Sequence, residues 1–104
     1  MKKFIIERNL PGAGILTPEE LQMISQASCE AIARLGKPYY WIQSFIANDR
    51  IYCVHIAESE SDVREHARLG NIPINTVNEV ITIIDPLTGK TLKHATQKIV
   101  NPVI

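Results

Sequence analysis

Apolar runs and helix-start signals alternate along most of the chain. Short apolar runs bounded by turn residues predict four strands, which span 3–8, 39–47, 51–57 and 77–85. Capped segments between them predict two helices, which span 18–35 and 60–70. The resulting order, βαββαβ, predicts an α+β fold, the ferredoxin-like plait, with both helices on one face of an antiparallel four-stranded sheet.

Both predicted helices carry a cap at the start. Thr17 can accept an amide hydrogen bond as N-cap, and Glu20, three residues later, can bond back to it. Ser59 and Asp62 form the equivalent pair at the second helix. Gly36 follows the first helix and is expected to take the left-handed cap conformation.

Alternation of side chains predicts which residues of the third strand the helices cover. The more apolar set is Tyr52, Val54 and Ile56, so we expect these three side chains under the helices. Cys53 and His55 would then point to the second face of the sheet.

The same alternation on the second strand predicts two sets. The set expected under the helices is Ile42, Ser44 and Ile46. The set expected on the second face is Trp41, Gln43 and Phe45. Together with Cys53 and His55, the second face is too apolar to be left in water. We therefore expect a homodimer with two sheets packed face to face, a dimeric α+β barrel whose polar residues line an interior cavity.

Composition narrows the classes of partner. The chain of 104 residues has 11 Lys plus Arg and 11 Asp plus Glu, so no basic excess favours nucleic acid or an anionic membrane surface. Glu7 and Arg8 interrupt the first apolar run too early for a signal peptide, and no run reaches transmembrane length. We expect a cytoplasmic protein, in which Cys29 and Cys53 are free thiols.

We expect one domain over residues 1–85 and a C-terminal extension over 86–104. Apolar residues at 99–100 and 103–104 would let the extension add an edge strand or act as an arm on a partner. Pro11 to Gly14 is interpreted as a plain loop, because its Gly-x-Gly lacks the further glycine of a dinucleotide fingerprint.

Several short groups of residues occur in a recognisable order and spacing. They are Glu7-Arg8, Pro11-Gly12, residues 41–45, 51–54 and 64–67, Gly70 and Pro73. In this order they resemble the domain-of-unknown-function 4242 family, small ferredoxin-like proteins of which some are described as nickel-binding. The resemblance covers roughly residues 1–85 and implies that fold, with nickel or another divalent transition metal as ligand. His55 stands where that family leads us to expect an aromatic residue.

His66 is the first candidate for chemistry. It lies beside Val63 and Ala67 at the edge of the apolar helix face, from which it can reach inward to a pocket. Asp62, four residues earlier, would hold the imidazole. The alternative is a structural histidine that bonds the loop at 71–75.

Cys53 and His55 are the second candidate. Two residues apart on a strand they share a face, with Cα atoms about 6.5–7 Å apart. Thiolate and imidazole both ligate nickel, copper or zinc. Further metal ligands would come from the twin pair of a dimer, or from Glu7 and His66. Glu7, Trp41, Gln43, His55 and His66 are the residues expected to line a small-molecule site, whereas His94 is interpreted as a solvated surface residue.

Three functions remain open at this point. The first is a dimeric binding protein for nickel or another divalent metal through His66, His55 and Cys53. The second is a dimeric-barrel enzyme, with His55 or His66 as base and Tyr52 or Tyr40 as acid. The third is a non-catalytic oligomeric module. The sequence contains no nucleophile elbow, metalloprotease helix or phosphate loop.

Overall fold

The computed structural model describes residues 1–91. The strands are β1 (Lys2–Asn9), β2 (Tyr39–Ile46), β3 (Arg50–Ala57) and β4 (Thr76–Glu79). The helices are α1 (Pro18–Leu35), α2 (Glu60–Gly70) and the short α3 (Thr88–Thr91), with a 3-10 turn, η1 (Ala13–Ile15). All strand pairs are antiparallel, in the order β2-β3-β1-β4. The predicted α+β fold with a four-stranded antiparallel sheet is confirmed.

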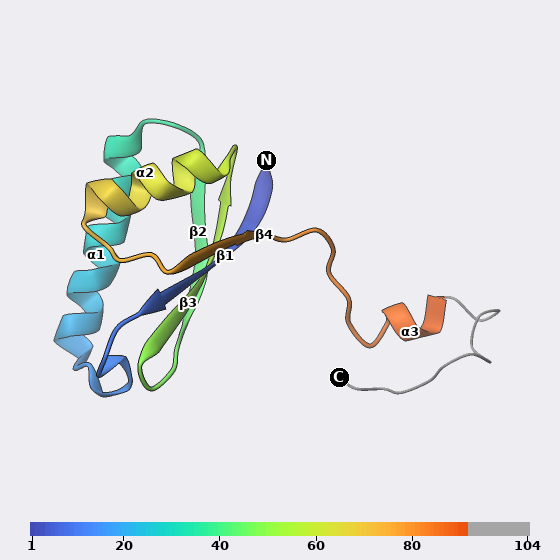
Figure 1. Ribbon diagram of the computed structural model, residues 1–104, viewed down its shortest axis with the longest axis horizontal. Coiled ribbons are helices and arrows are strands. Elements are labelled where there is room, and N and C mark those ends of the chain that lie inside the picture. Colours follow the sequence, from blue (N-terminus) through green and yellow to red (C-terminus); the bar gives the residue numbers. More distant parts are fainter. Residues whose placement is uncertain (92–104) are drawn as a thin grey trace.

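The long helices α1 and α2 both cover one face of the sheet, called here the helix side (Figure 1). The cap of α1 forms as predicted, but that of α2 forms only in part: the Ser59 hydroxyl accepts from the amide of Asp62 at 3.3 Å, whereas the Asp62 carboxylate pairs with Lys37. The Thr17 hydroxyl accepts from the amide of Glu20 at 3.1 Å, and the Glu20 carboxylate accepts from the amide of Thr17 at 3.0 Å. Gly36 ends α1 with a φ of 67°, whereas Asn71, with a φ of 51°, takes the left-handed position after α2.

The Thr17 cap gives a first testable prediction. Thr17→Ala should lower the free energy of unfolding by about 1 kcal/mol, because the amide of Glu20 loses its partner. Gln26→Ala, at an exposed position on the same helix, is the matched control. Urea denaturation of both variants measures the difference, and equal midpoints for the two would contradict the capping role.

The helix side of β1 and β3 is not the side expected from hydropathy. Phe4, Ile6 and Arg8 of β1 are buried, and so are Cys53 and His55 of β3. The prediction that Cys53 and His55 point to the second face is therefore wrong. The hydropathy of the two strand faces takes no account of hydrogen bonding. The polar side chains on the buried face have partners there, because Cys53 accepts from Arg8 and His55 bonds Tyr39.

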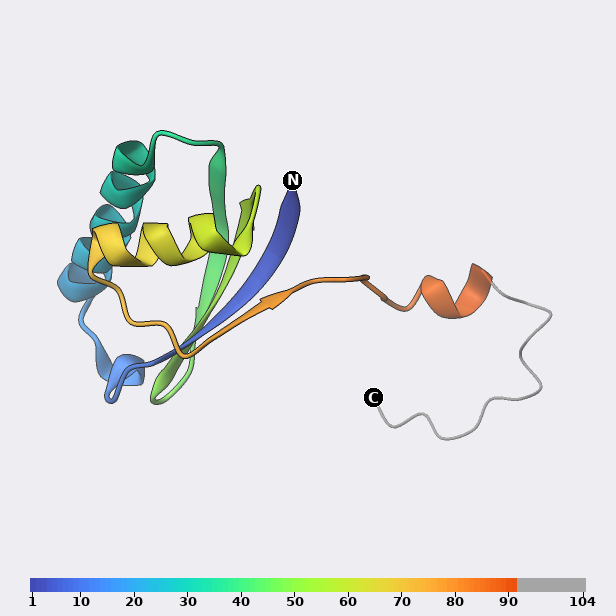
Figure 2. The same cartoon turned by 45° about the horizontal axis from the view of Figure 1, so that its top comes forward.

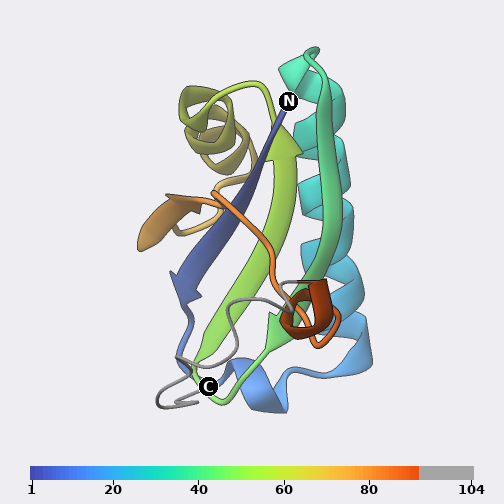
Figure 3. The ribbon, with the colours of Figure 1, turned by 90° about the vertical axis from the view of Figure 1, so that its right-hand side faces the viewer.

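The opposite side of the sheet, called here the open face, carries the other set from β3. Tyr52, Val54 and Ile56 are only partly buried there, although we expected them under the helices. Figure 3 shows the sheet from this side, with both long helices behind it. The part of the open face that β3 forms is thus more apolar than predicted, because Tyr52, Val54 and Ile56 lie there in place of Cys53 and His55.

A β-bulge changes the alternation on β2. The register shifts between Trp41, opposite His55, and Gln43, opposite Val54. Trp41 therefore lies on the helix side and Ile42 is the unpaired extra residue, so both of these predictions are wrong. Strict alternation fails wherever a strand carries one residue more than its partner. The predicted sides of the other four residues are correct; these residues are Gln43, Ser44, Phe45 and Ile46.

Strand β4 is shorter than the predicted 77–85. It pairs only with β1, and the amide of Val80 makes the last bond, to the carbonyl of Lys3 at 2.8 Å. Because β1 itself starts at Lys2, the residues after Val80 have no strand left to pair with. They continue away from the sheet as an extended segment, residues 81–87, called here the arm (Figure 2).

The arm exposes large apolar side chains, with relative exposures of 62–86%. They are Ile81, Ile83, Ile84 and Leu87. The boundary between residues 85 and 86 stays a prediction. The predictions made for His94 and for residues 99–104 fall outside the described residues.

The glycine loop before α1 bonds to the β2–β3 turn. The amide of Gly12 donates to the Asp49 carboxylate at 2.9 Å, and that of Gly14 donates to the carbonyl of Asn48 at 2.8 Å. These amides are therefore already used within the chain, which agrees with a plain loop. No helix within residues 1–91 has the combined length and apolar character required to cross a bilayer.

Candidate functional site: a cavity beside a buried arginine

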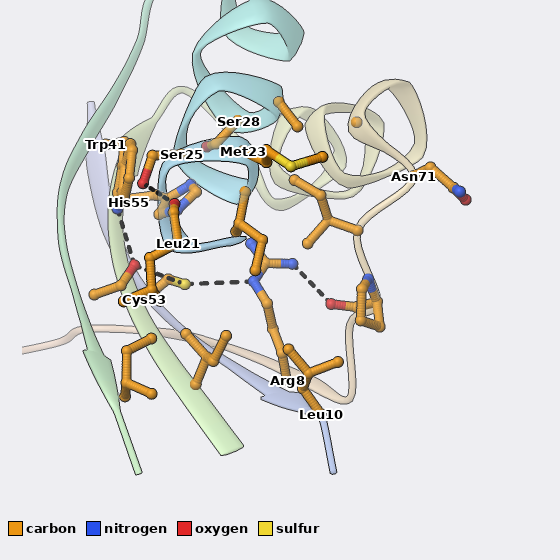
Figure 4. A pocket seen from close by; sticks show the side chains of 18 residues that line it. Arg8, Leu10, Leu21, Met23, Ser25, Ser28, Trp41, Cys53, His55 and Asn71 are labelled. Carbon is orange, nitrogen blue, oxygen red and sulfur yellow. Dashed lines mark hydrogen bonds between the residues drawn. The ribbon is translucent and has the colours of Figure 1, made fainter. Parts of the chain in front are cut away.

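A cavity of about 460 Å³ lies between α1, the helix side of the sheet and the loop after α2 (Figure 4). This volume is within the range of sites for small organic ligands. Most of its lining is apolar, and α1 supplies much of it through Leu21, Met23 and Ile24. The polar side chains that the strands contribute are Arg8, Trp41, Ser44, Cys53 and His55, and α1 and the residue after α2 add Ser25, Ser28 and Asn71.

Arg8 is the charged residue of this cavity and is only 4% exposed. It follows Phe4 and Ile6 at the strand period, so the sheet turns it toward the helices. Its Nε donates to the sulfur of Cys53 at 3.3 Å and its Nη1 donates to the carbonyl of Pro73 at 2.8 Å. Figure 4 shows the guanidinium between these two partners.

The Cys53 sulfur accepts a second hydrogen bond. The hydroxyl of Ser44 donates to it at 3.0 Å, and the indole Nε1 of Trp41 donates to that hydroxyl at 2.9 Å. A continuous chain of hydrogen bonds therefore runs from Trp41 through Ser44 and Cys53 to Arg8. The bulge in β2 makes this chain possible, because it places Trp41 and Ser44 on the same side of the sheet.

Two histidines and a tyrosine form a cluster at the cavity wall, in which His55 lines the cavity while His66 and Tyr39 pack behind it. The Tyr39 hydroxyl bonds Nδ1 of His55 at 2.5 Å, and the Tyr39 ring stacks on His66 with centroids 4.7 Å apart. The centroids of His55 and His66 are 5.2 Å apart. His66 is fully buried, and its Nε2 donates to the carbonyl of Ser28 on α1 at 3.1 Å. The ring therefore links α2 to α1.

Burial controls the protonation of this cluster. It lowers the pKa of His55 to about 3, with smaller contributions from the nearby His66 and Arg8. Burial also lowers the pKa of His66, helped by Arg8 and opposed by the hydrogen bond to Ser28. Burial raises the pKa of the Tyr39 phenol. Both imidazoles are thus neutral at neutral pH, and Arg8 is the positive charge of the site.

His66 keeps one unused nitrogen. With Nε2 donating to α1, Nδ1 is a lone-pair acceptor, and it is buried without a hydrogen-bond partner in the described part of the chain. The prediction of a structural histidine bonded to the loop at 71–75 gave the wrong partner, since the bond goes to Ser28. His66 points inward, as predicted, but it does not line the cavity.

The structure separates the residues predicted for one site. Trp41, Cys53 and His55 line the cavity, and His66 lies behind it. Glu7 is on the open face, where its carboxylate accepts from Arg50 at 2.8 Å. Gln43 is exposed on that same face.

Sequence reasoning missed three residues of the site, which are Arg8, Tyr39 and Ser44. A signal for Arg8 was available in the alternation that buries Phe4 and Ile6.

The predicted metal ligands do not fit a resident divalent cation. Among residues 1–91, no group of three or more His, Cys, Asp or Glu side chains could hold a metal ion. The positive charge of Arg8 already disfavours protonation of both imidazoles, and it would disfavour a dication in the same place. The nearby buried carboxylate, Asp62, is paired with Lys37 at 3.3 Å.

The two cysteines differ in exposure. Both are free thiols, as predicted, and Cys53 is buried whereas Cys29, on α1, is exposed.

Comparisons with known proteins define the family. The model of the family described as "Nickel responsive protein SCO4226-like" matches residues 4–80. The solved structure titled "Crystal structure analysis of SCO4226 from Streptomyces coelicolor A3(2)" has a TM-score of 0.67 and 18% identity, covering 79% of this chain and 99% of that one. No curated protein matches this sequence. The 4242 family name stays a prediction with which these findings are compatible. This chain belongs to the nickel responsive, SCO4226-like family.

Proposed function

We propose that this chain is a small cytoplasmic ligand-binding protein with a nickel-related role, built on a ferredoxin-like plait. The family match over residues 4–80 supports the relation to nickel. The observation that carries the binding function is the cavity of about 460 Å³, whose polar groups converge on the buried Arg8. The strand order β2-β3-β1-β4, with both crossover helices on one side, supports the plait.

Binding is favoured over catalysis because the predicted acids, Tyr40 and Tyr52, do not contact the predicted base His55. A general base works best with a pKa near the operating pH, whereas burial lowers the pKa of His55 to about 3. Tyr40 and Tyr52, the predicted acids, lie on the open face, away from His55. The phenol that does contact His55, Tyr39, has a raised pKa and a buried ring.

Calorimetric titration of the metal-free full chain with nickel, copper and zinc tests the nickel relation. We expect nickel binding tighter than about 1 mM, or about 4 kcal/mol. We also expect His66→Ala to retain it, since His66 and its neighbours do not fit a dication. Loss of tight binding in that variant would restore His66, His55 and Cys53 as the metal ligands. Absence of binding to the wild-type chain would contradict nickel binding altogether.

We also propose that the protein is a homodimer whose open faces pack together. The open face carries apolar side chains from three strands; among them are Ile5, Tyr40, Phe45, Val54 and Ile56. Apolar patches of this kind typically mark an interface. The arm adds a second argument for a copy of this chain as the partner, because it extends from the edge of the same sheet with exposed isoleucines.

A charge placed on the open face should prevent the dimer. Phe45 is 54% exposed there, and Phe45→Glu would place a carboxylate in the proposed apolar interface. Light scattering at micromolar concentration should give two chains for the wild type and one for Phe45→Glu. Ile15→Glu, on the exposed turn η1, is the control that should remain dimeric. A monomeric wild type would contradict the proposal.

A further inference from the structure

We infer that the cavity binds a small apolar monocarboxylate, with the carboxylate paired to the guanidinium of Arg8. This inference rests on the proposed ligand-binding function and names the class of ligand. It is independent of where nickel binds.

The first observation is a buried charge with no counter-ion. Arg8 is 4% exposed, and no carboxylate within residues 1–91 forms an ion pair with it. Its hydrogen bonds to described residues are those to the sulfur of Cys53 and the carbonyl of Pro73. A guanidinium has five N–H donors, so several remain for an anion. A buried charge without a partner is costly, and a bound carboxylate would remove that cost.

Two carboxylates that could have been the counter-ion of Arg8 are paired with other residues. Glu7, its neighbour in sequence, points to the open face and bonds Arg50 at 2.8 Å. Asp62 lies on α2 and pairs with Lys37 at 3.3 Å. The described part of the chain therefore leaves the counter-ion of Arg8 to a ligand.

The charge of the cavity favours a monoanion over phosphate. His55, which lines it, and His66, behind it, are both neutral at neutral pH, since burial lowers the pKa of each imidazole. Arg8 then supplies a single positive charge. A planar carboxylate matches the guanidinium fork with one charge and two acceptor oxygens.

The apolar lining of the rest of the cavity favours a ligand that is apolar apart from its carboxylate. Leu21, Ile24 and Ile51 line it together with Ile72. An aromatic or short aliphatic chain would bury its surface against these side chains. The volume of about 460 Å³ accommodates such a molecule together with its carboxylate.

The test compares acids with their neutral amides on the full chain by calorimetry. The probes are phenylacetate and hexanoate, with phenylacetamide, hexanamide and inorganic phosphate as comparisons. We expect the wild type to bind at least one acid about tenfold or more tightly than its amide, which is about 1.4 kcal/mol. Arg8→Met should abolish that preference. Arg64→Met, which removes an exposed arginine outside this cavity, should keep it.

A second variant keeps the test valid if Arg8→Met does not fold. Ala27→Phe leaves Arg8 in place and adds bulk to a lining position of α1, so it should weaken binding of the acid about tenfold. Equal binding of acid and amide would overturn the carboxylate inference and leave the ligand-binding function standing. Phosphate bound more tightly than either acid, or a preference retained by Arg8→Met, would overturn it too. No binding of any organic probe would overturn both proposals.

Discussion

Replacing Tyr39 by alanine should lower the free energy of unfolding by about 3–5 kcal/mol, the range for truncating a large buried aromatic side chain. Tyr39 is 5% exposed and packs in the core cluster with Phe4 and Val63. Its ring stacks on His66, and its hydroxyl bonds Nδ1 of His55. The substitution would thus leave a cavity and remove the contact that holds both histidines.

Tyr39→Phe separates the ring from the hydroxyl. It keeps the stack on His66 but leaves Nδ1 of His55 without its partner, so we expect a smaller loss of about 1–3 kcal/mol. Urea denaturation of the two variants and the wild type gives both differences. Equal losses for Tyr39→Phe and Tyr39→Ala would contradict the role of the stacked ring.

Acid should destabilise the folded protein below pH 6.5. The pKa of His55 is about 3 when folded and 6.5 when free, so between these values the unfolded chain binds a proton that the folded chain does not. Stability is therefore fully present above about pH 6.5 and is lost as the pH falls toward 3. The slope approaches about 1.4 kcal/mol per pH unit, and the loss between pH 6.5 and 4.5 is about 2 kcal/mol. His66, whose pKa is also lowered, acts in the same direction.

Denaturation midpoints at several pH values measure this effect. Because carboxylates also titrate in acid, the informative quantity is the difference between the wild type and His55→Phe. We expect a shallower loss of stability for His55→Phe between pH 6.5 and 4.5. The control Gln26→Ala, at an exposed position, should lose stability with the same slope as the wild type. Parallel curves for the wild type and His55→Phe would contradict the neutral, buried state of His55.

The order of elements could be predicted from the sequence because it depends on local signals. Thr17 and Gly36 define the ends of α1 through cap chemistry that involves only neighbouring residues. The end of β4 depends on its partner instead, since pairing stops where β1 begins at Lys2. Residues 81–84 include three isoleucines and resemble a strand in sequence, but no strand of the described chain pairs with them.

The candidate site was harder to predict because it depends on contacts between distant residues. Cys53 and His55 are buried since Arg8 and Tyr39, far away in sequence, satisfy their hydrogen bonds. Hydropathy along one strand carries no information about such partners. Arg8 was also missed, although the alternation from Phe4 through Ile6 would have put it on the same strand face as those two residues.

The hydrophobic pattern also gave no indication of the bulge in β2. It brings Trp41 opposite His55 and allows Ser44 to bond Cys53. An unbroken alternation would have put Trp41 and Ser44 on opposite faces. Neither glycine nor proline marks the position, since the extra residue is Ile42.

Nuclear magnetic resonance of the Arg8 Nε–H group during titration with phenylacetate tests most directly whether the ligand site lies inside the fold. We expect the Arg8 Nε–H signal and the amide of Cys53 to shift together and saturate, because both adjoin the cavity. Shifts confined to Tyr52, Val54 and Phe45, with Arg8 unchanged, would place the ligand on the open face and contradict the site proposed for the cavity.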